Sequence, residues 1–263
     1  MGSAAGGKAM PLPVRHGVAP SFVILPAGCS GTLLDFLTRH FPAIPRQTWE
    51  ARLARAEVVD EGGRVMQADT PCRQNAKVFY YRELQAETPI PFEETILHLD
   101  AHLLVADKPH FLPVTPSGRF LQETLLVRLR RKTGLPHLSP IHRLDRETAG
   151  VILFSVDPAT RGRYQSLFQQ RSVVKVYEAL AGKLHGVQFP LTYRSRMVDG
   201  TPFFRMQEVP GVANSETVIT PMQTRGELVL YRLEPLTGRK HQLRLHMASL
   251  ALRINSRPMM TNT

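Results

Sequence analysis

A proline-containing segment in the first third of the chain limits what the rest can fold into. In Thr88-Pro89-Ile90-Pro91 the two prolines fix φ and lack a backbone N–H donor, so no regular helix or paired strand continues through them. With 263 residues, the chain can bury a small module before this segment and a larger core after it. We therefore expect a linker near 87–91 between a module at 21–86 and a domain at 87–263. Residues 1–20 are rich in Gly, Ala and Pro and lack the apolar run of a secretion signal, so we expect a flexible leader there.

The module at 21–86 is predicted to contain two short helices, a hairpin and a strand. Apolar spacing over 31–39 fits one face of a helix, and Pro45 is well placed to begin a second helix that runs through Arg55. Short apolar runs at 58–59 and 64–66 flank the turn at 60–63, which is typical of a hairpin, and 77–81 has the pattern of a further strand.

Beyond the linker, strand and helix patterns follow one another irregularly. Strands are predicted at 95–99, 103–106, 151–154 and 173–181, helices at 121–132 and 159–170, and a last helix from Leu243 to Leu250. No regular βαβ repeat occurs. We therefore expect an α+β domain with a mainly antiparallel mixed sheet.

The most distinctive chemistry lies in the segment from Ile141 to Gly150. One carboxylate, Asp145, stands between the guanidiniums of Arg143 and Arg146, directly before the apolar strand predicted at 151–154. A loop fixed to a sheet is a common place for catalytic groups. The alternative is that these three residues form a solvated surface ion-pair cluster.

Residues 142–150, His-Arg-Leu-Asp-Arg-Glu-Thr-Ala-Gly, resemble the signature of the RluA-type pseudouridine synthases, usually H-R-L-D-x-x-T-S-G. Two more stretches resemble motifs of that family in the same order: Lys175 to Leu180 matches K-x-Y-x-A-L, and Leu236 to His246 matches L-x-T-G-R-x-H-Q-[IL]-R-x-H. A weaker match at 105–114 resembles K-P-x-G-L-P-V, with Phe111 in place of the Gly. The element order of the first module, with arginines around its helices, resembles an S4 RNA-binding module. These arginines are Arg39, Arg46, Arg52 and Arg55.

The resemblance implies isomerisation of uridine to pseudouridine in RNA, with Asp145 as the essential carboxylate, acting as nucleophile or as base. Arg244 would pair with Asp145, and Tyr177 would lie over the uracil face with Leu243 on its other side. Because a base inside a helix is out of reach, the target would be flipped out at a cost of a few kcal/mol, and Arg143 would fill the vacated space. His142 would lie beside the substrate, chiefly as a hydrogen-bonding strut for its loop. The isomerisation needs no nucleotide or redox cofactor, and none is expected.

Composition agrees with an RNA partner. The formal net charge is +11 and the calculated pI about 10.2, which is typical of nucleic-acid binders and also of some membrane-surface proteins. No apolar run approaches the roughly 20 residues of a membrane span. Cys29 and Cys72 are far apart in sequence and suggest neither a disulfide framework nor a zinc site, so we expect a cytoplasmic protein. The pairs His137/His142 and His241/His246 lack the i,i+4 spacing of a zinc-hydrolase motif, and no metal is expected.

Three classes of function stay open at this point. The first is a pseudouridine synthase acting on ribosomal or transfer RNA, as a monomer. The second is an RNA-binding protein of the same fold without catalysis. The third is an RNA or nucleoside glycosidase that uses Asp145 and Glu147 as paired carboxylates.

The C-terminus departs from the family pattern. Relatives usually continue after the last helix with G-x-P-I-x-x-D, whereas residues 251–257 keep the Ile but lack the Gly, Pro and Asp. We expect a truncated catalytic domain with marginal stability or reduced activity, because an uncovered sheet exposes apolar surface and unpaired backbone groups.

Overall fold

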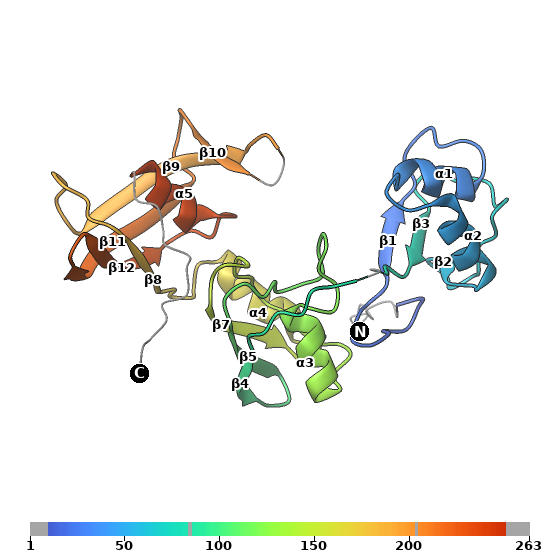
Figure 1. The fold of residues 1–263 in the computed structure, drawn as a ribbon, viewed down its shortest axis with the longest axis horizontal. Coiled ribbons are helices and arrows are strands. Elements are labelled where there is room, and N and C mark those ends of the chain that lie inside the picture. Colours follow the sequence, from blue (N-terminus) through green and yellow to red (C-terminus); the bar gives the residue numbers. More distant parts are fainter. Residues whose placement is uncertain (1–9, 84–85, 203–204, 251–263) are drawn as a thin grey trace, which may run out of the picture. The chain divides into compact units, whose positions relative to one another are not determined.

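The computed structural model describes residues 10–83, 86–202 and 205–250. The chain divides into two compact units, Met1–Pro158 and Ala159–Thr263, and each is described by itself (Figure 1). The expected linker around Glu87–Pro91 is irregular, as predicted, and belongs to the first unit.

The N-terminal part of the first unit contains the helices and strands predicted for the module and one further strand, at 21–24, that was not predicted. They are β1 (Ser21–Ile24), α1 (Leu33–His40), α2 (Arg46–Ala54), β2 (Val58–Asp60) and β3 (Lys77–Tyr80). The strands form an antiparallel sheet in the order β1-β3-β2. Both predicted helices are confirmed to within about two residues at each end. The hairpin is also confirmed, because Val59 bridges Val65 and the Asp60 N–H donates to the Arg64 carbonyl at 2.9 Å.

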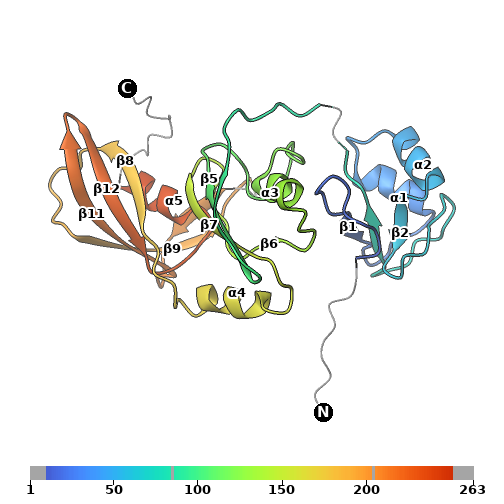
Figure 2. The ribbon, with the colours of Figure 1, turned by 90° about the horizontal axis from the view of Figure 1, so that it is seen from below.

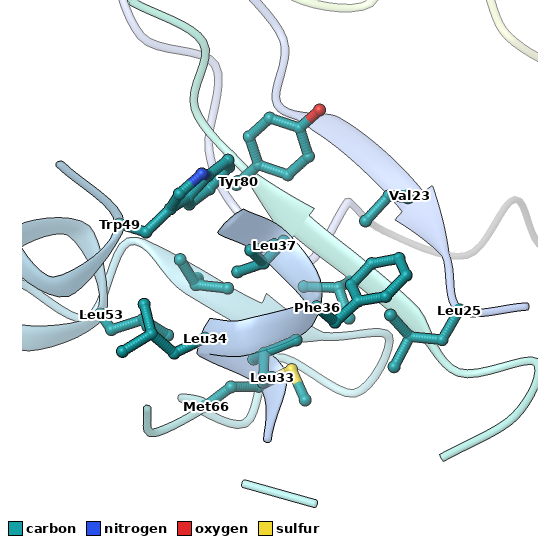
Figure 3. Close-up of a cluster of buried hydrophobic side chains, with 12 residues drawn as sticks. Val23, Leu25, Leu33, Leu34, Phe36, Leu37, Trp49, Leu53, Met66 and Tyr80 are labelled. Atoms are coloured by element: carbon teal, nitrogen blue, oxygen red, sulfur yellow. The ribbon is translucent and has the colours of Figure 1, made fainter. Parts of the chain in front are cut away.

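This part of the chain has its own hydrophobic core (Figure 3). The apolar face of α1 supplies Leu33 and Leu37, both fully buried, and α2 supplies Trp49, which meets the Tyr80 ring edge-on at 5.2 Å between centroids. Thr32 caps α1 by accepting the Asp35 N–H at 3.2 Å. The local pattern of the sequence is therefore sufficient to form these elements and to give them a common buried side.

The expected flexible leader is wrong for the part of it that the structure describes. Residues 1–9 lie outside the described residues, but Leu12 is buried against Val59, Phe79 and Tyr81, and Val18 is buried against Leu121 and Val127. Arg15 and Val18 exchange two backbone hydrogen bonds, of 3.0 and 2.8 Å. Leu12 and Val18, two apolar residues in a Gly- and Pro-rich stretch, are thus each buried in a different hydrophobic cluster. Composition alone does not predict this packing.

The two cysteines, which are far apart in sequence, lie close together in the structure. Both pack against the core of the module, and neither forms a disulfide. Pairing of Thr32 with Pro71 brings the two segments side by side. Burial and a hydrogen bond with the Cys29 thiol raise the pKa of Cys72 to about 11. Their separation in sequence was therefore a poor guide to their separation in space.

The rest of the first unit is built on a four-stranded antiparallel sheet (Figure 2). Its elements are β4 (Thr95–Leu99), β5 (Leu103–Lys108), α3 (Leu125–Thr133), β6 (Ser139–Pro140) and β7 (Gly150–Ser155), and the strand order is β4-β5-β7-β6. The predicted strands at 95–99, 103–106 and 151–154 are confirmed. Helix α3 begins four residues later than predicted, because the Glu87 carboxylate accepts the N–H groups of residues 121–123 at 2.7–2.8 Å and Thr124 then caps the helix.

The second unit is a five-stranded antiparallel sheet with short helices. It comprises α4 (Arg161–Gln169), β8 (Tyr177–Gly182), β9 (Leu191–Asp199), β10 (Met206–Val209), β11 (Ser215–Arg225), β12 (Leu228–Pro235) and α5 (Gln242–Ser249), and the strand order is β10-β9-β11-β12-β8. Met247 of α5 packs into the core of this sheet with Tyr231 and Leu233. The strand predicted at 173–181 begins later, at Tyr177.

Every strand pairing within the described ranges is antiparallel, and helices accompany both larger sheets, which confirms the predicted α+β class. No helix in the described part of the chain is both long and apolar enough to cross a bilayer. The unusual C-terminal sequence at 251–257 lies outside the described residues.

Candidate active site

Asp145 lies on the loop between β6 and β7. Two side chains of this loop, Ile141 and Leu144, are each 7% exposed and anchor it in the interior of the first unit. The Ile141 N–H donates to the Leu153 carbonyl at 2.9 Å, and the Thr148 N–H donates to the Asp145 carbonyl at 3.1 Å, which closes a turn. Asp145 is thus partly exposed on a turn that backbone hydrogen bonds and buried side chains hold in place.

A fully buried lysine holds this turn in place. The Lys108 ammonium, at the end of β5, donates to the carbonyls of Pro109, Leu112 and Arg146 at 2.9, 2.8 and 3.1 Å. Burial lowers its pKa to about 8, against the opposing effect of nearby carboxylates that include Asp145. Lys108 therefore connects the turn directly after Asp145 to the segment at 109–112. Sequence reasoning placed this lysine in a motif but gave it no role, since its third partner lies 38 residues away.

The segment at 109–112 has an unusual backbone. Phe111 has φ of 66°, in the left-handed region that favours glycine, and it occupies the position where the resembling motif has Gly. A non-glycine residue in this conformation costs about 1 kcal/mol or more. Beside it, His110 Nδ1 lies 2.7 Å from the Glu147 carbonyl, a second contact between this segment and the Asp145 loop. The contacts with the loop give a physical reason to retain a strained residue here.

The other motif residues have distinct roles in the loop. His142 Nε2 accepts the Leu153 N–H at 3.1 Å, which supports its predicted use as a strut. Arg143 is exposed. Arg146 forms an ion pair with Glu147 at 2.9 Å, and Glu147 is not a member of the surface cluster considered as the alternative.

The remaining predicted site residues belong to the second unit. Tyr177 opens β8 and Leu243 lies on α5, and both pack partly buried against the same core cluster. Arg244 follows Leu243 on α5 and is exposed. The structure thus groups His142, Arg143 and Asp145 on one loop of the first unit, and Tyr177, Leu243 and Arg244 in the second.

The four arginines predicted to bind RNA differ in their surroundings. Arg52 is 3% exposed and lies 4.9 Å from the centre of the Trp49 ring, so its side chain is not available to an RNA phosphate. Arg46 pairs with Asp35 at 2.8 Å, and Arg55 pairs with Glu57 at 2.8 Å. Arg39 donates to two backbone carbonyls and lines a surface hollow beside His40. Helix periodicity alone does not show which arginine turns toward the core.

Potential metal ligands are dispersed. In the ranges that the structure describes, no group of three or more His, Cys, Asp or Glu side chains is placed to hold a metal ion.

Comparison with known proteins identifies the family. The family model described as RNA pseudouridylate synthase matches residues 102–249, more than half of the chain, and this span contains Asp145, Tyr177 and Arg244. A protein of Synechocystis sp. named as an RNA pseudouridine synthase is 26% identical over 83% of this chain and 75% of its own length. Human pseudouridylate synthase RPUSD2 is 31% identical over 62% of this chain and 30% of its own length.

A third relative is the mitochondrial tRNA pseudouridine(32) synthase of Saccharomyces cerevisiae, 28% identical over 64% of this chain and 37% of its own length. The chain therefore spans less than half of the human and yeast relatives that it matches. The family model nevertheless covers all three motifs found in the sequence, and the chain belongs to the family of RNA pseudouridylate synthases.

Proposed function

We propose that this protein isomerises specific uridines of structured RNA to pseudouridine. The observation that carries the proposal is the match of the family model over a span that contains Asp145 on a loop held by buried anchors and by Lys108. Such a loop meets a requirement of catalysis, since a reacting group must be held close to its productive geometry.

The reaction breaks the N1–C1′ bond, turns the uracil and forms a C5–C1′ bond, without oxidation or reduction. A carboxylate suits it because its reference pKa of about 3.9 leaves it ionised at neutral pH. Asp145 would attack as a nucleophile or remove a sugar proton as a base, and both routes remain open. No cofactor is required by either.

The other site residues are proposed from their motif positions. Arg244 would pair with Asp145 and keep the carboxylate charged in a pocket that must otherwise grip an apolar base face. Tyr177 and Leu243 would lie on opposite faces of the uracil. Arg143 would occupy the space that the flipped nucleotide leaves, consistent with its exposure on the loop.

RNA binding would draw on the net charge of +11 and on the S4-like module. Of the arginines predicted there, Arg39, Arg46 and Arg55 are at the surface, and we omit the buried Arg52. Ribosomal RNA is the expected substrate class, and the name of the yeast relative makes transfer RNA the other candidate. We propose a monomer that acts in the cytoplasm.

Product analysis tests this function against its two alternatives. Total RNA from cells that lack the gene, labelled with [5-³H]uridine, is incubated with the purified protein and then digested to nucleosides. A pseudouridine synthase releases tritium and forms pseudouridine without free uracil. Formation of free uracil would identify a glycosidase, and tight RNA binding without either product would identify a binding protein. Mapping pseudouridines in RNA from cells with and without the gene then names the target.

A further inference from the structure

We propose that Thr217, Gln242 and His246, here called the α5 latch, position Arg244 for the reaction. This inference rests on the proposed function, because it takes Arg244 as the partner of the catalytic carboxylate. It adds three positioning residues that act through α5 and do not themselves touch the substrate.

Gln242 fastens the start of α5 with every hydrogen-bonding group of its side chain. Its Oε1 accepts the Thr237 hydroxyl at 2.7 Å and the Arg239 N–H at 3.0 Å. Its Nε2 donates to the Glu216 carbonyl and to Thr217 Oγ1, both at 3.0 Å. Because an N–H can only donate and a carbonyl can only accept, these partners fix the orientation of the amide without ambiguity.

His246 fastens the same side of the helix one turn later and is fully buried. We assign the Ser215 hydroxyl as donor to the Ser195 carbonyl at 2.8 Å and therefore as acceptor from His246 Nε2, which lies 3.0 Å from Ser215 Oγ and 3.2 Å from Ser195 Oγ. Nε2 therefore carries the proton of the neutral ring, and Nδ1 accepts from the Thr217 hydroxyl at 3.0 Å. Thr217 thus accepts from Gln242 and donates to His246, and it links the two.

The neighbours of His246 favour its neutral form. Burial lowers its pKa, opposed by the charge of Glu208 on β10. Tyr193 on β9 meets the imidazole edge-on at 4.9 Å between ring centres. Glu208 itself accepts the Tyr193 hydroxyl at 3.1 Å and the Ser249 hydroxyl at 2.7 Å, which secures the end of α5.

The latch adds to the few buried apolar contacts of α5. The helix has eight residues, too few to be stable alone, and Met247 is its only fully buried apolar side chain. Residues 242 and 246 are one turn apart on the buried side, and residue 244, about 200° from 242 around the axis, points the other way. A rotation of the helix would move Arg244 directly. The shared hydroxyl of Thr217 resists that rotation at two points.

Thr217→Val tests the latch, since it keeps the shape of the side chain and removes the hydroxyl. Thr217→Ser retains the hydroxyl, and Thr220→Val makes the same change on the same strand outside the latch. We expect Thr217→Val to lower kcat roughly 10- to 100-fold with KM and RNA affinity within about twofold of wild type. Thr217→Ser and Thr220→Val should keep nearly full kcat. Rates are measured as tritium release from the labelled total RNA and expressed per RNA-binding-competent protein, so that a loss of folded protein does not count as a loss of kcat.

Two further readouts separate positioning from simple stability. In an Arg244→Lys background, Thr217→Val should lose most of its effect, because there is no guanidinium left to misplace. The ¹⁵N spectrum of wild-type His246 should show the neutral tautomer protonated at Nε2 at pH 7. Unchanged kcat in Thr217→Val, failure of Thr217→Ser to restore it, an undiminished effect in the Arg244→Lys background, or the opposite tautomer would overturn the latch. Inactive wild-type protein would instead reject the proposed function.

Discussion

The Asp145 loop and helix α5 present their key side chains by different means. One buried ammonium, Lys108, binds the Arg146 carbonyl of the loop at 3.1 Å and two carbonyls of the segment at 109–112 at 2.8 and 2.9 Å, and so ties the two segments together. Helix α5 is fastened instead by neutral side chains, those of Gln242, His246 and Thr217. In this protein the irregular loop is fixed through its backbone and the short helix through its side chains. The two regions should therefore fail differently when perturbed.

The largest effect is expected for Asp145→Asn, which removes the carboxylate and leaves its support untouched. The amide has the same size but cannot act as nucleophile or base, so isomerisation should be abolished while RNA affinity stays nearly unchanged. Tritium release and filter binding measure the two. Asp199→Asn, an exposed aspartate at the end of β9, is the matched control. A variant that retains a tenth of wild-type turnover would contradict the assignment.

Lys108→Met should come next, because it leaves three carbonyls of the loop region without their donor. We expect the free energy of unfolding to fall by about 2–3 kcal/mol and kcat to fall at least tenfold. Lys175→Met is the control, because Lys175 donates to one carbonyl, that of Thr237 at 3.0 Å. Its loss should lower the free energy of unfolding by about 1 kcal/mol. Urea unfolding and tritium release give both quantities. Equal losses in the two variants would refute the special role given to the loop.

A smaller effect is expected for Arg39→Gln, which tests the first module without disturbing its fold. Deleting residues 1–86 would be a poor test, because Val18 packs against Leu121 and Val127 in the catalytic part of the unit. If Arg39 contacts a phosphate, the slope of log affinity against log salt falls by about 0.7–0.9. Arg52→Gln should leave this slope unchanged, since Arg52 is buried. Identical slopes for wild type and Arg39→Gln would remove Arg39 from the interface.

The smallest effect is expected for the pH dependence of stability, which tests the contribution of His246 to the packing of α5. Burial lowers the pKa of His246 below its ordinary value of 6.5, so the unfolded chain binds a proton more readily than the folded one. The stability that the neutral ring contributes is present above pH 6.5 and is lost as the pH falls through the lowered pKa. Between pH 7.5 and 5, the melting temperature of wild type should therefore drop further than that of His246→Gln. Parallel curves would show that this ring does not titrate differently in the folded state.

Local patterns predicted much of the fold. The helices of the module, its hairpin and strand β7 follow from apolar spacing and turn residues within a few positions of one another, and the structure contains all of them. Helix α3 shows the limit of this reasoning. The apolar pattern extends back to Leu121. The carboxylate of Glu87, more than thirty residues earlier, accepts the N–H groups of residues 121–123, so the helix begins only at Leu125.

What the sequence did not reveal depends on contacts between distant residues. Lys108 reaches Arg146, Cys29 lies beside Cys72, and Leu12 and Val18 find separate buried clusters. The burial of Arg52 likewise depends on how α2 rotates about Trp49. The motifs named the site residues by resemblance, but the way in which each is held emerged only from the structure.

The central proposal is that Asp145 and Arg244 take part in the same chemical step. Single-turnover rates of pseudouridine formation for Asp145→Glu, which keeps a displaced carboxylate, Arg244→Met and the double variant, on RNA from cells without the gene, test it most directly. Residues that act as a unit are strongly non-additive. The account predicts a severe loss in Arg244→Met and a double variant no slower than the slower of the two single variants. A near-normal rate in Arg244→Met, or a double variant whose loss is the product of two independent losses, would contradict it.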